Sequence, residues 1–153
     1  MPETGGTPQQ LPQALAEIRD DFLSLEEPER LQLLLEFADE LPEMPARLAD
    51  HPELQERVVE CQSPVFIVLE LNDGIVTMHA KAPPEAPTTR GFASILAQGL
   101  TGLPADEMLA VPGDFPQMLG LTRAVSPLRI SGMTGMLMRA KRQVSALAAV
   151  ADQ

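Results

Sequence analysis

The most reactive side chain in this sequence belongs to its single cysteine, Cys61. It lies in the segment VVECQSP (58–64), directly before the most β-like stretch of the chain. A loop beside a strand can present a sulfur atom while the sheet holds it in place. A lone cysteine is often a small buried hydrophobic residue, but its neighbours are then usually apolar, whereas Glu60 and Gln62 flank this one. We therefore take Cys61 as a candidate nucleophile.

The neighbours of Cys61 limit the reactions that it could support. The thiolate is the nucleophile, and a carboxylate such as Glu60 beside the thiol raises its pKa. A hydrolase or transferase would also need a base near the sulfur, and the only histidines are His51 and His79. His79 falls on a predicted strand, where it can simply face solvent. A self-contained Cys61–His79 enzyme and a non-catalytic adaptor with an inert cysteine both stay open.

The composition limits the class of partner. The chain has 153 residues, enough for one domain, which we expect over residues 11–150 after a disordered leader at 1–10. With 11 basic and 22 acidic residues, its net charge of −11 disfavours nucleic acid and anionic membranes as partners. The chain has no Trp and no Tyr, so it lacks the aromatic platforms on which bases stack.

The cysteine count and the hydropathy indicate the compartment. One cysteine cannot form an internal disulfide, nor a zinc or iron–sulfur site built on several thiolates. Two histidines without clustered acidic residues also make a poor metal site. The first residues lack the apolar core of a signal peptide, and no segment approaches the roughly 20 apolar residues of a membrane span. We therefore expect a cytoplasmic protein with no metal of its own.

The elements that must position Cys61 form an α+β pattern. Residues 65–71 and 75–80 are β-branched and apolar, and NDG at 72–74 is a hairpin turn signal. Residues 58–59 add a short third strand, which predicts a small three-stranded antiparallel sheet with helices packed on it. Apolar spacings of three and four, and first-turn prolines at Pro87 and Pro127, predict the helices. These are residues 11–25, 28–41, 87–100, 104–109, 115–119 and 127–150, and residues 42–57 are expected to be irregular.

The residues around Cys61 resemble the cysteine motif of the SufE family, the sulfur acceptors of iron–sulfur cluster assembly, and of their CsdE relatives. The family pattern reads V-P-G-C-Q-S-x-V or close to it, and this chain has CQS at 61–63 followed by Val65. Further matches are Asp73-Gly74 in the hairpin, RG at 90–91 and SPLRISGM at 126–133. The order and spacing of these elements make the match more specific than CQS alone, and the resemblance covers roughly residues 11–148.

The resemblance implies a fold and a function. The fold is a small antiparallel sheet with packed helices, similar to IscU-type scaffolds, which agrees with the outline above. The function is a persulfide relay: a PLP-dependent cysteine desulfurase, of the SufS or CsdA kind, loads sulfur onto Cys61, and the sulfur passes to a cluster scaffold. The carrier stimulates the desulfurase and is a monomer when free. The PLP belongs to the desulfurase, so this chain needs no cofactor.

The resemblance also carries over supporting residues. Arg129 matches a family arginine near the cysteine loop, where its guanidinium would favour the thiolate. Glu85 matches an acidic residue at a helix start beside that loop. Gln62 and Ser63 belong to the cysteine motif itself and complete the predicted partner-binding set.

Two departures from the family pattern concern the same region. Glu60 replaces the usual glycine before the cysteine, and Leu128 replaces the usual serine before Arg129. Neither change removes a reacting atom, but the first alters the backbone freedom of the loop. Because a persulfide is easily oxidised or reduced, we expect the loop to shelter Cys61 at rest and to expose it to a partner.

Overall fold

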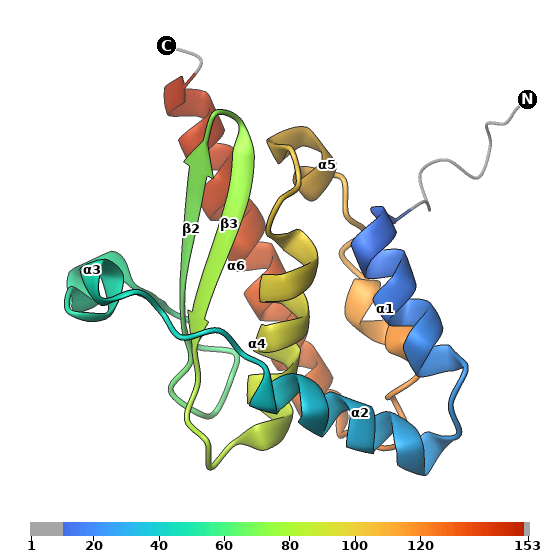
Figure 1. Cartoon of the computed structure of the whole chain (residues 1–153). Coiled ribbons are helices and arrows are strands. Elements are labelled where there is room, and N and C mark those ends of the chain that lie inside the picture. Colours follow the sequence, from blue (N-terminus) through green and yellow to red (C-terminus); the bar gives the residue numbers. More distant parts are fainter. Residues whose placement is uncertain (1–10, 152–153) are drawn as a thin grey trace, which may run out of the picture.

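A β-hairpin lies at the centre of the computed structural model, which describes residues 11–151 (Figure 1). Its strands, β2 (Phe66–Asn72) and β3 (Ile75–Lys81), pair antiparallel along their whole length. Asp73 and Gly74 connect them with positive φ angles of 53° and 78°, as a type I′ turn requires at both central residues. The hairpin and the position of its turn are therefore as predicted.

Two helices cover one face of this hairpin. In Figure 1, α6 (Pro127–Ala151) runs along β2, and α4 (Pro87–Leu100) runs along β3. Successive side chains of a strand point to opposite faces, so every second residue of each strand enters the core. The buried residues on this face are Ile67, Leu69, Val76, Met78 and Ala80. Both helices begin at the prolines that the sequence analysis placed in first turns.

The remaining helices complete the α+β fold. The first two, α1 (Gln13–Leu23) and α2 (Glu27–Asp39), pack against α4, and Figure 1 shows α1 on the side of α4 away from the hairpin. They bury the predicted apolar stripes through residues such as Leu15 and Leu34. Two short elements, α5 (Ala105–Leu109) and η3 (Phe115–Leu119), connect α4 to α6. The predicted fold class is confirmed.

The third strand lies two residues earlier than predicted. β1 is Glu56–Arg57 and pairs with the start of β2, whereas the apolar pattern favours residues 58–59. Val58 is buried at the end of the ladder, and Val59 is 65% exposed in the loop that follows. The charged strand is held against α6 by the Glu56 carboxylate, which accepts hydrogen bonds from three side chains of that helix, and no local pattern reveals these contacts.

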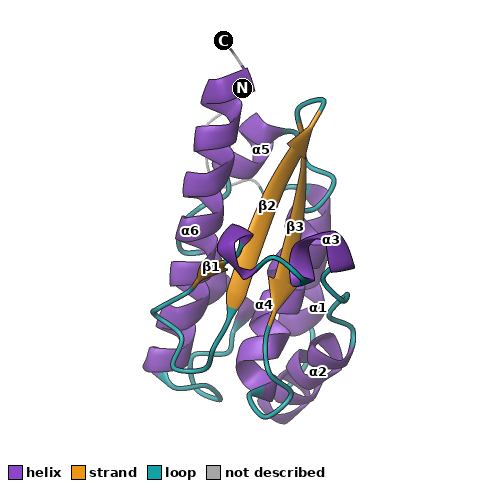
Figure 2. Cartoon of the chain, turned by 90° about the vertical axis from the view of Figure 1, so that its left-hand side faces the viewer, coloured by secondary structure: helices purple, strands orange, loops and turns teal. Residues whose placement is uncertain are grey.

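The segment predicted to be irregular, residues 42–57, is more ordered than expected. Besides β1 it contains α3 (Ala46–Ala49) and η2 (Pro52–Leu54). In Figure 2, α3 lies in front of the hairpin, on the face opposite α4. Arg47 of α3 forms a bidentate ion pair with Glu70 of β2, at 2.5 and 2.8 Å, and His79 of β3 contacts the same carboxylate at 2.9 Å.

Two further sequence expectations concern the ends of the chain and the membrane. The predicted leader, residues 1–10, lies outside the described residues. Within residues 11–151, none of the helices combines the length and the apolar character needed to cross a membrane.

The variant Glu70→Gln tests the contact between α3 and the sheet. The Arg47 guanidinium, and after it the His79 ring, hold the pKa of Glu70 down at about 2. Because a glutamate in an unfolded chain titrates near pH 4.3, this stabilisation is complete above that pH and is lost as the pH falls toward 2. We expect the variant to lower the free energy of unfolding by about 1 kcal/mol at pH 7.

Urea denaturation of both proteins across the acid range measures the effect. The difference in unfolding free energy between wild type and variant should shrink as the pH falls through about 4 toward 2. A difference that stays constant or grows on acidification would contradict the role of the Glu70 carboxylate.

Candidate functional site

The loop between β1 and β2, residues 58–65, carries the cysteine and is called the cysteine loop below. At its base, the backbone N–H of Val58 donates to the carbonyl oxygen of Val65 at 2.9 Å. The N–H of Cys61 donates to the carbonyl oxygen of Val58 at 3.1 Å, which closes a tight turn. Cys61 is therefore held one turn beyond the end of the β1–β2 ladder.

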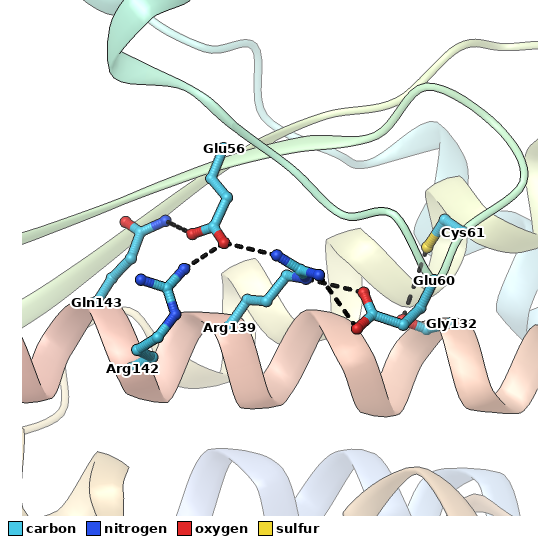
Figure 3. A network of polar contacts seen from close by, with 7 residues as sticks. All are labelled: Glu56, Glu60, Cys61, Gly132, Arg139, Arg142 and Gln143. Atoms are coloured by element: carbon cyan, nitrogen blue, oxygen red, sulfur yellow. Dashed lines mark hydrogen bonds and ion pairs between the residues drawn. The ribbon is translucent and has the colours of Figure 1, made fainter.

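The cysteine loop folds onto the N-terminal half of α6, and this contact covers the sulfur. Cys61 is 5% exposed and belongs to the main hydrophobic core. Its Sγ lies 3.6 Å from the carbonyl oxygen of Gly132, to which the thiol donates a weak hydrogen bond (Figure 3). The position is the sheltered one that we expected of the loop at rest.

A cavity of about 110 Å³ adjoins the sulfur. Its lining comes from the cysteine loop, from the start of α6 and from the first turn of α4. The lining residues are Glu60, Cys61, Gln62, Ser63, Thr89, Leu128, Arg129 and Gly132. Gln62 and Arg129 are exposed and Leu128 is 53% exposed, so the cavity lies at the protein surface. The sulfur is covered but is not sealed in the interior.

The surroundings of Cys61 keep the thiol protonated. Burial raises the pKa of Cys61 to about 11, and the negative charge of Glu60 contributes further. We expected the Arg129 guanidinium to oppose Glu60, but in this conformation it does not lower the Cys61 pKa. The sheltered sulfur is therefore a thiol at neutral pH and a poor nucleophile until its environment changes.

Arg139, not Arg129, is the partner of the Glu60 carboxylate. Its Nε donates to one oxygen at 2.8 Å and its Nη2 to the other at 3.3 Å (Figure 3). Its Nη1 donates to Glu56 of β1 at 2.8 Å. Glu56 also accepts hydrogen bonds from Gln143, at 2.7 Å, and from Arg142. One arginine of α6 thus binds both the strand before the cysteine loop and the loop itself.

Two glycines of α6 make room for the cysteine loop. A Cβ at Gly132 would lie 3.1 Å from the Cys61 Sγ. A Cβ at Gly135 would lie 2.7 Å from the carboxyl carbon of Glu60 and 2.8 Å from its Cβ. Such separations are well below the roughly 3.5–4.0 Å of favourable carbon contacts. The loop reaches its position only because these two positions of the helix have no side chains.

The structure brings together most of the residues that the sequence analysis selected. Cys61, Gln62, Ser63 and Arg129 line one cavity. Glu85 is exposed in the turn before α4 and lies outside that lining. The histidines are also elsewhere: His79 contacts Glu70, and His51 contacts Glu53 at 3.0 Å.

Sequence reasoning missed Arg139, Gly135 and Thr89. Thr89 is 6% exposed and reaches the cavity from α4. A signal for the other two was present, since Arg129, Gly132, Gly135 and Arg139 follow one another at intervals of three or four residues. That spacing places them on one face of a helix, and this face meets the cysteine loop. Within residues 11–151, no group of three or more His, Cys, Asp or Glu side chains is arranged to hold a metal ion.

The family model and the relatives that match this chain all point to the same family. Residues 16–144 match the SufE model, described as an Fe-S metabolism associated domain. An uncharacterized SufE-like protein of Mycobacterium tuberculosis is 51% identical over 138 residues, which cover 90% of this chain and 95% of that protein. The SufE-like protein 1, chloroplastic/mitochondrial, of Arabidopsis thaliana is 28% identical over 84% of this chain and 34% of its own length.

A solved structure is similar to this chain over most of its length. The solution structure of a hypothetical protein from Thermus thermophilus matches with a TM-score of 0.80 and 34% sequence identity. The match covers 92% of this chain and 99% of that one.

The variant Gly135→Ala tests the fit between the cysteine loop and α6. The added Cβ overlaps Glu60, so the loop must move outward. We expect the free energy of unfolding to fall by about 1–3 kcal/mol from this overpacking, although alanine favours the helix by about 1 kcal/mol. Cys61 should react faster with iodoacetamide, measured by mass spectrometry.

Gly113→Ala is the matched control. A Cβ at Gly113 would meet only the sulfur of Met138, at an ordinary 3.8 Å. This variant should alkylate at the wild-type rate. Unchanged alkylation in Gly135→Ala would show that the loop does not need the open helix face.

Proposed function

The chain belongs to the SufE family, and from this we propose that it is a sulfur carrier built around Cys61. A PLP-dependent cysteine desulfurase loads sulfur onto Cys61, the carrier stimulates that enzyme, and the sulfur passes to a scaffold for iron–sulfur cluster assembly. The observation that carries the proposal is the position of the only cysteine. It lies on a loop, covered by α6 but beside a surface cavity.

The proposed reaction is a thiol exchange without net oxidation. The Cys61 thiolate attacks the outer sulfur of a persulfide on the desulfurase cysteine. A sulfur–sulfur bond forms at Cys61 while the one in the desulfurase breaks, and the desulfurase leaves as a thiolate. The proton that Cys61 loses balances the one that this leaving thiolate takes up. One cysteine is sufficient, and a second thiol nearby would convert the persulfide to a disulfide.

The burial of Cys61 supports a carrier that opens before it reacts. With a pKa of about 11 the thiol is almost wholly protonated at pH 7, and its thiolate fraction is far below that of an ordinary cysteine, whose pKa is about 8.5. Moving the sulfur away from α6 removes the burial that causes this shift. The same movement brings Gln62 and Ser63, which directly follow Cys61, toward the partner.

No observation favours the self-contained enzyme. Its proposed base, His79, contacts Glu70 on the sheet and does not line the cavity beside Cys61. A cysteine hydrolase needs the base within hydrogen-bond reach of the sulfur. The adaptor with an inert cysteine is distinguished from the carrier by the following experiment.

The variant Cys61→Ser tests the carrier function. Incubated with a cysteine desulfurase of its own organism and free cysteine, the wild-type chain should gain one sulfur, about 32 Da, at Cys61, because each exchange transfers one sulfur atom. The variant should gain no mass and should not stimulate the desulfurase. Intact-protein and peptide mass spectrometry under non-reducing conditions measure the mass gain, and the rate of alanine release by the desulfurase measures the stimulation.

His79→Ala is the control for this experiment, and it should take up sulfur at the wild-type rate. Loss of uptake in this variant would support the Cys61–His79 enzyme instead. Full stimulation of the desulfurase by Cys61→Ser would support the adaptor.

The variant Arg129→Ala tests the cavity arginine. Within residues 11–151 its guanidinium makes no hydrogen bond or ion pair, so we expect the free energy of unfolding to change by less than about 0.5 kcal/mol. Sulfur uptake should slow by about tenfold, the value of one hydrogen bond to a charged group. The time course of persulfide formation measures this.

Arg123→Ala is the matched control, because the Arg123 side chain is 85% exposed and its nearest ion-pair contact, with Glu27, is a long 3.8 Å. It should load at the wild-type rate. Equal rates for the two variants would remove Arg129 from the proposed site.

A further inference from the structure

We propose that the ion pair between Glu60 and Arg139 is a latch that holds Cys61 in its sheltered position and sets how often the sulfur becomes accessible. The inference rests on the proposed function for its consequence, since a carrier must expose Cys61 to be loaded. It assigns Glu60 and Arg139 as positioning residues, which act on the reaction through Cys61.

The contacts of the cysteine loop point to this pair. The sulfur itself is held to α6 only by burial and by one weak hydrogen bond of 3.6 Å to Gly132. The residue before it, Glu60, is bound through both carboxylate oxygens to the Arg139 guanidinium, at 2.8 and 3.3 Å. This fork-to-fork geometry is the strongest arrangement of an arginine with a carboxylate. The firmest polar contact between the loop and α6 therefore lies directly beside the cysteine.

The cysteine loop depends on Arg139 for its attachment to α6, whereas the strand before it, β1, does not. Arg139 also donates to Glu56 of β1, but Glu56 keeps the hydrogen bonds from Gln143 and Arg142 when Arg139 is lost. β1 therefore stays attached to α6 without Arg139, whereas Glu60 has no other hydrogen-bond or ion-pair partner among the side chains of residues 11–151. Breaking the pair releases the loop alone.

The exposure of the pair makes it breakable. The side chains of Arg139 and Glu60 are 26% and 40% exposed, so water and salt reach the contact. Ion pairs of this kind are worth about 0.2–1 kcal/mol, or up to about fivefold in an equilibrium constant. Such a latch keeps the loop closed most of the time and still lets it open without unfolding the sheet.

An electrostatic role of Arg139 would have the opposite sign. The charged groups that line the cavity beside the sulfur are Glu60 and Arg129, and Arg139 forms an ion pair with Glu60. Removing Arg139 leaves the Glu60 charge uncompensated beside Cys61, which disfavours the thiolate. Through charge alone, an Arg139 variant should therefore react more slowly at its cysteine, whereas a broken latch makes it react faster.

The rate of iodoacetamide alkylation of Cys61 at fixed pH distinguishes the latch from a purely electrostatic role of Arg139. It uses a neutral reagent and the full chain, and it needs no desulfurase. We expect Arg139→Gln to react about three- to fivefold faster than the wild type, because the loop opens more often. Arg139→Lys, which keeps the charge but loses the fork, should react at a rate between those of the wild type and Arg139→Gln.

Salt provides a second measurement on the unaltered protein. Raising NaCl from about 0.05 to 1 M screens a partly exposed pair, so the wild-type alkylation rate should rise toward that of Arg139→Gln. The variant itself should respond little. If Arg139→Gln does not fold, the salt response of the wild type alone still decides the question.

Glu70→Gln is the matched control for loss of an ion pair in the same sheet. It removes the carboxylate that binds Arg47, on the opposite face from α6. It should leave the alkylation rate of Cys61 unchanged, although it lowers global stability.

An Arg139→Gln rate equal to or below the wild-type rate, or a wild-type rate that salt does not change, would overturn the latch. Sulfur uptake from a desulfurase can then still occur and would leave the carrier function intact. Conversely, a chain that opens as described but gains no sulfur would keep the latch and reject the carrier.

Discussion

The cysteine loop packs against two glycines of α6, Gly132 and Gly135, and this contact decides where the sulfur lies and how high the pKa of its thiol is. The absence of a side chain at Gly132 lets Cys61 approach the helix backbone, and the absence at Gly135 lets Glu60 pass alongside to reach Arg139. The water excluded by this fit is the main cause of the raised Cys61 pKa. Residue types on a helix distant in the chain therefore govern the chemistry of a residue in a loop.

Elements whose conformation depends on local interactions were predicted closely from the sequence. The NDG turn adopts the positive φ angles that such residues tolerate, and α4 begins and ends where Pro87 and the apolar spacing place it. β1 could not be predicted in the same way. Its position depends on Glu56 meeting side chains of α6 that lie 83 or more residues later in the chain, and a charged dipeptide shows no strand pattern by itself.

The same distinction holds for the candidate site: residues of one segment were predicted together, and a contact between distant segments was missed. Cys61 and its neighbours form one segment, so the sequence placed them together, and Arg129 entered through the resemblance and does line the cavity. Glu85 entered in the same way and lies outside it. The arginine that compensates Glu60 is Arg139, 79 residues away, and only the placement of α6 against the loop pairs them. Glu60, which stands where the family usually has glycine, is thus paired with an arginine of this chain.

The hydrogen bond from the Cys61 thiol to the Gly132 carbonyl oxygen depends on a proton that the proposed persulfide formation would remove. Once a second sulfur is attached, Sγ is bonded to carbon and to sulfur and has no hydrogen to donate. The proposed sulfur transfer would thus remove one contact that ties the cysteine loop to α6. In the proposed carrier, a persulfide at Cys61 would therefore be held less firmly against α6 than the free thiol is.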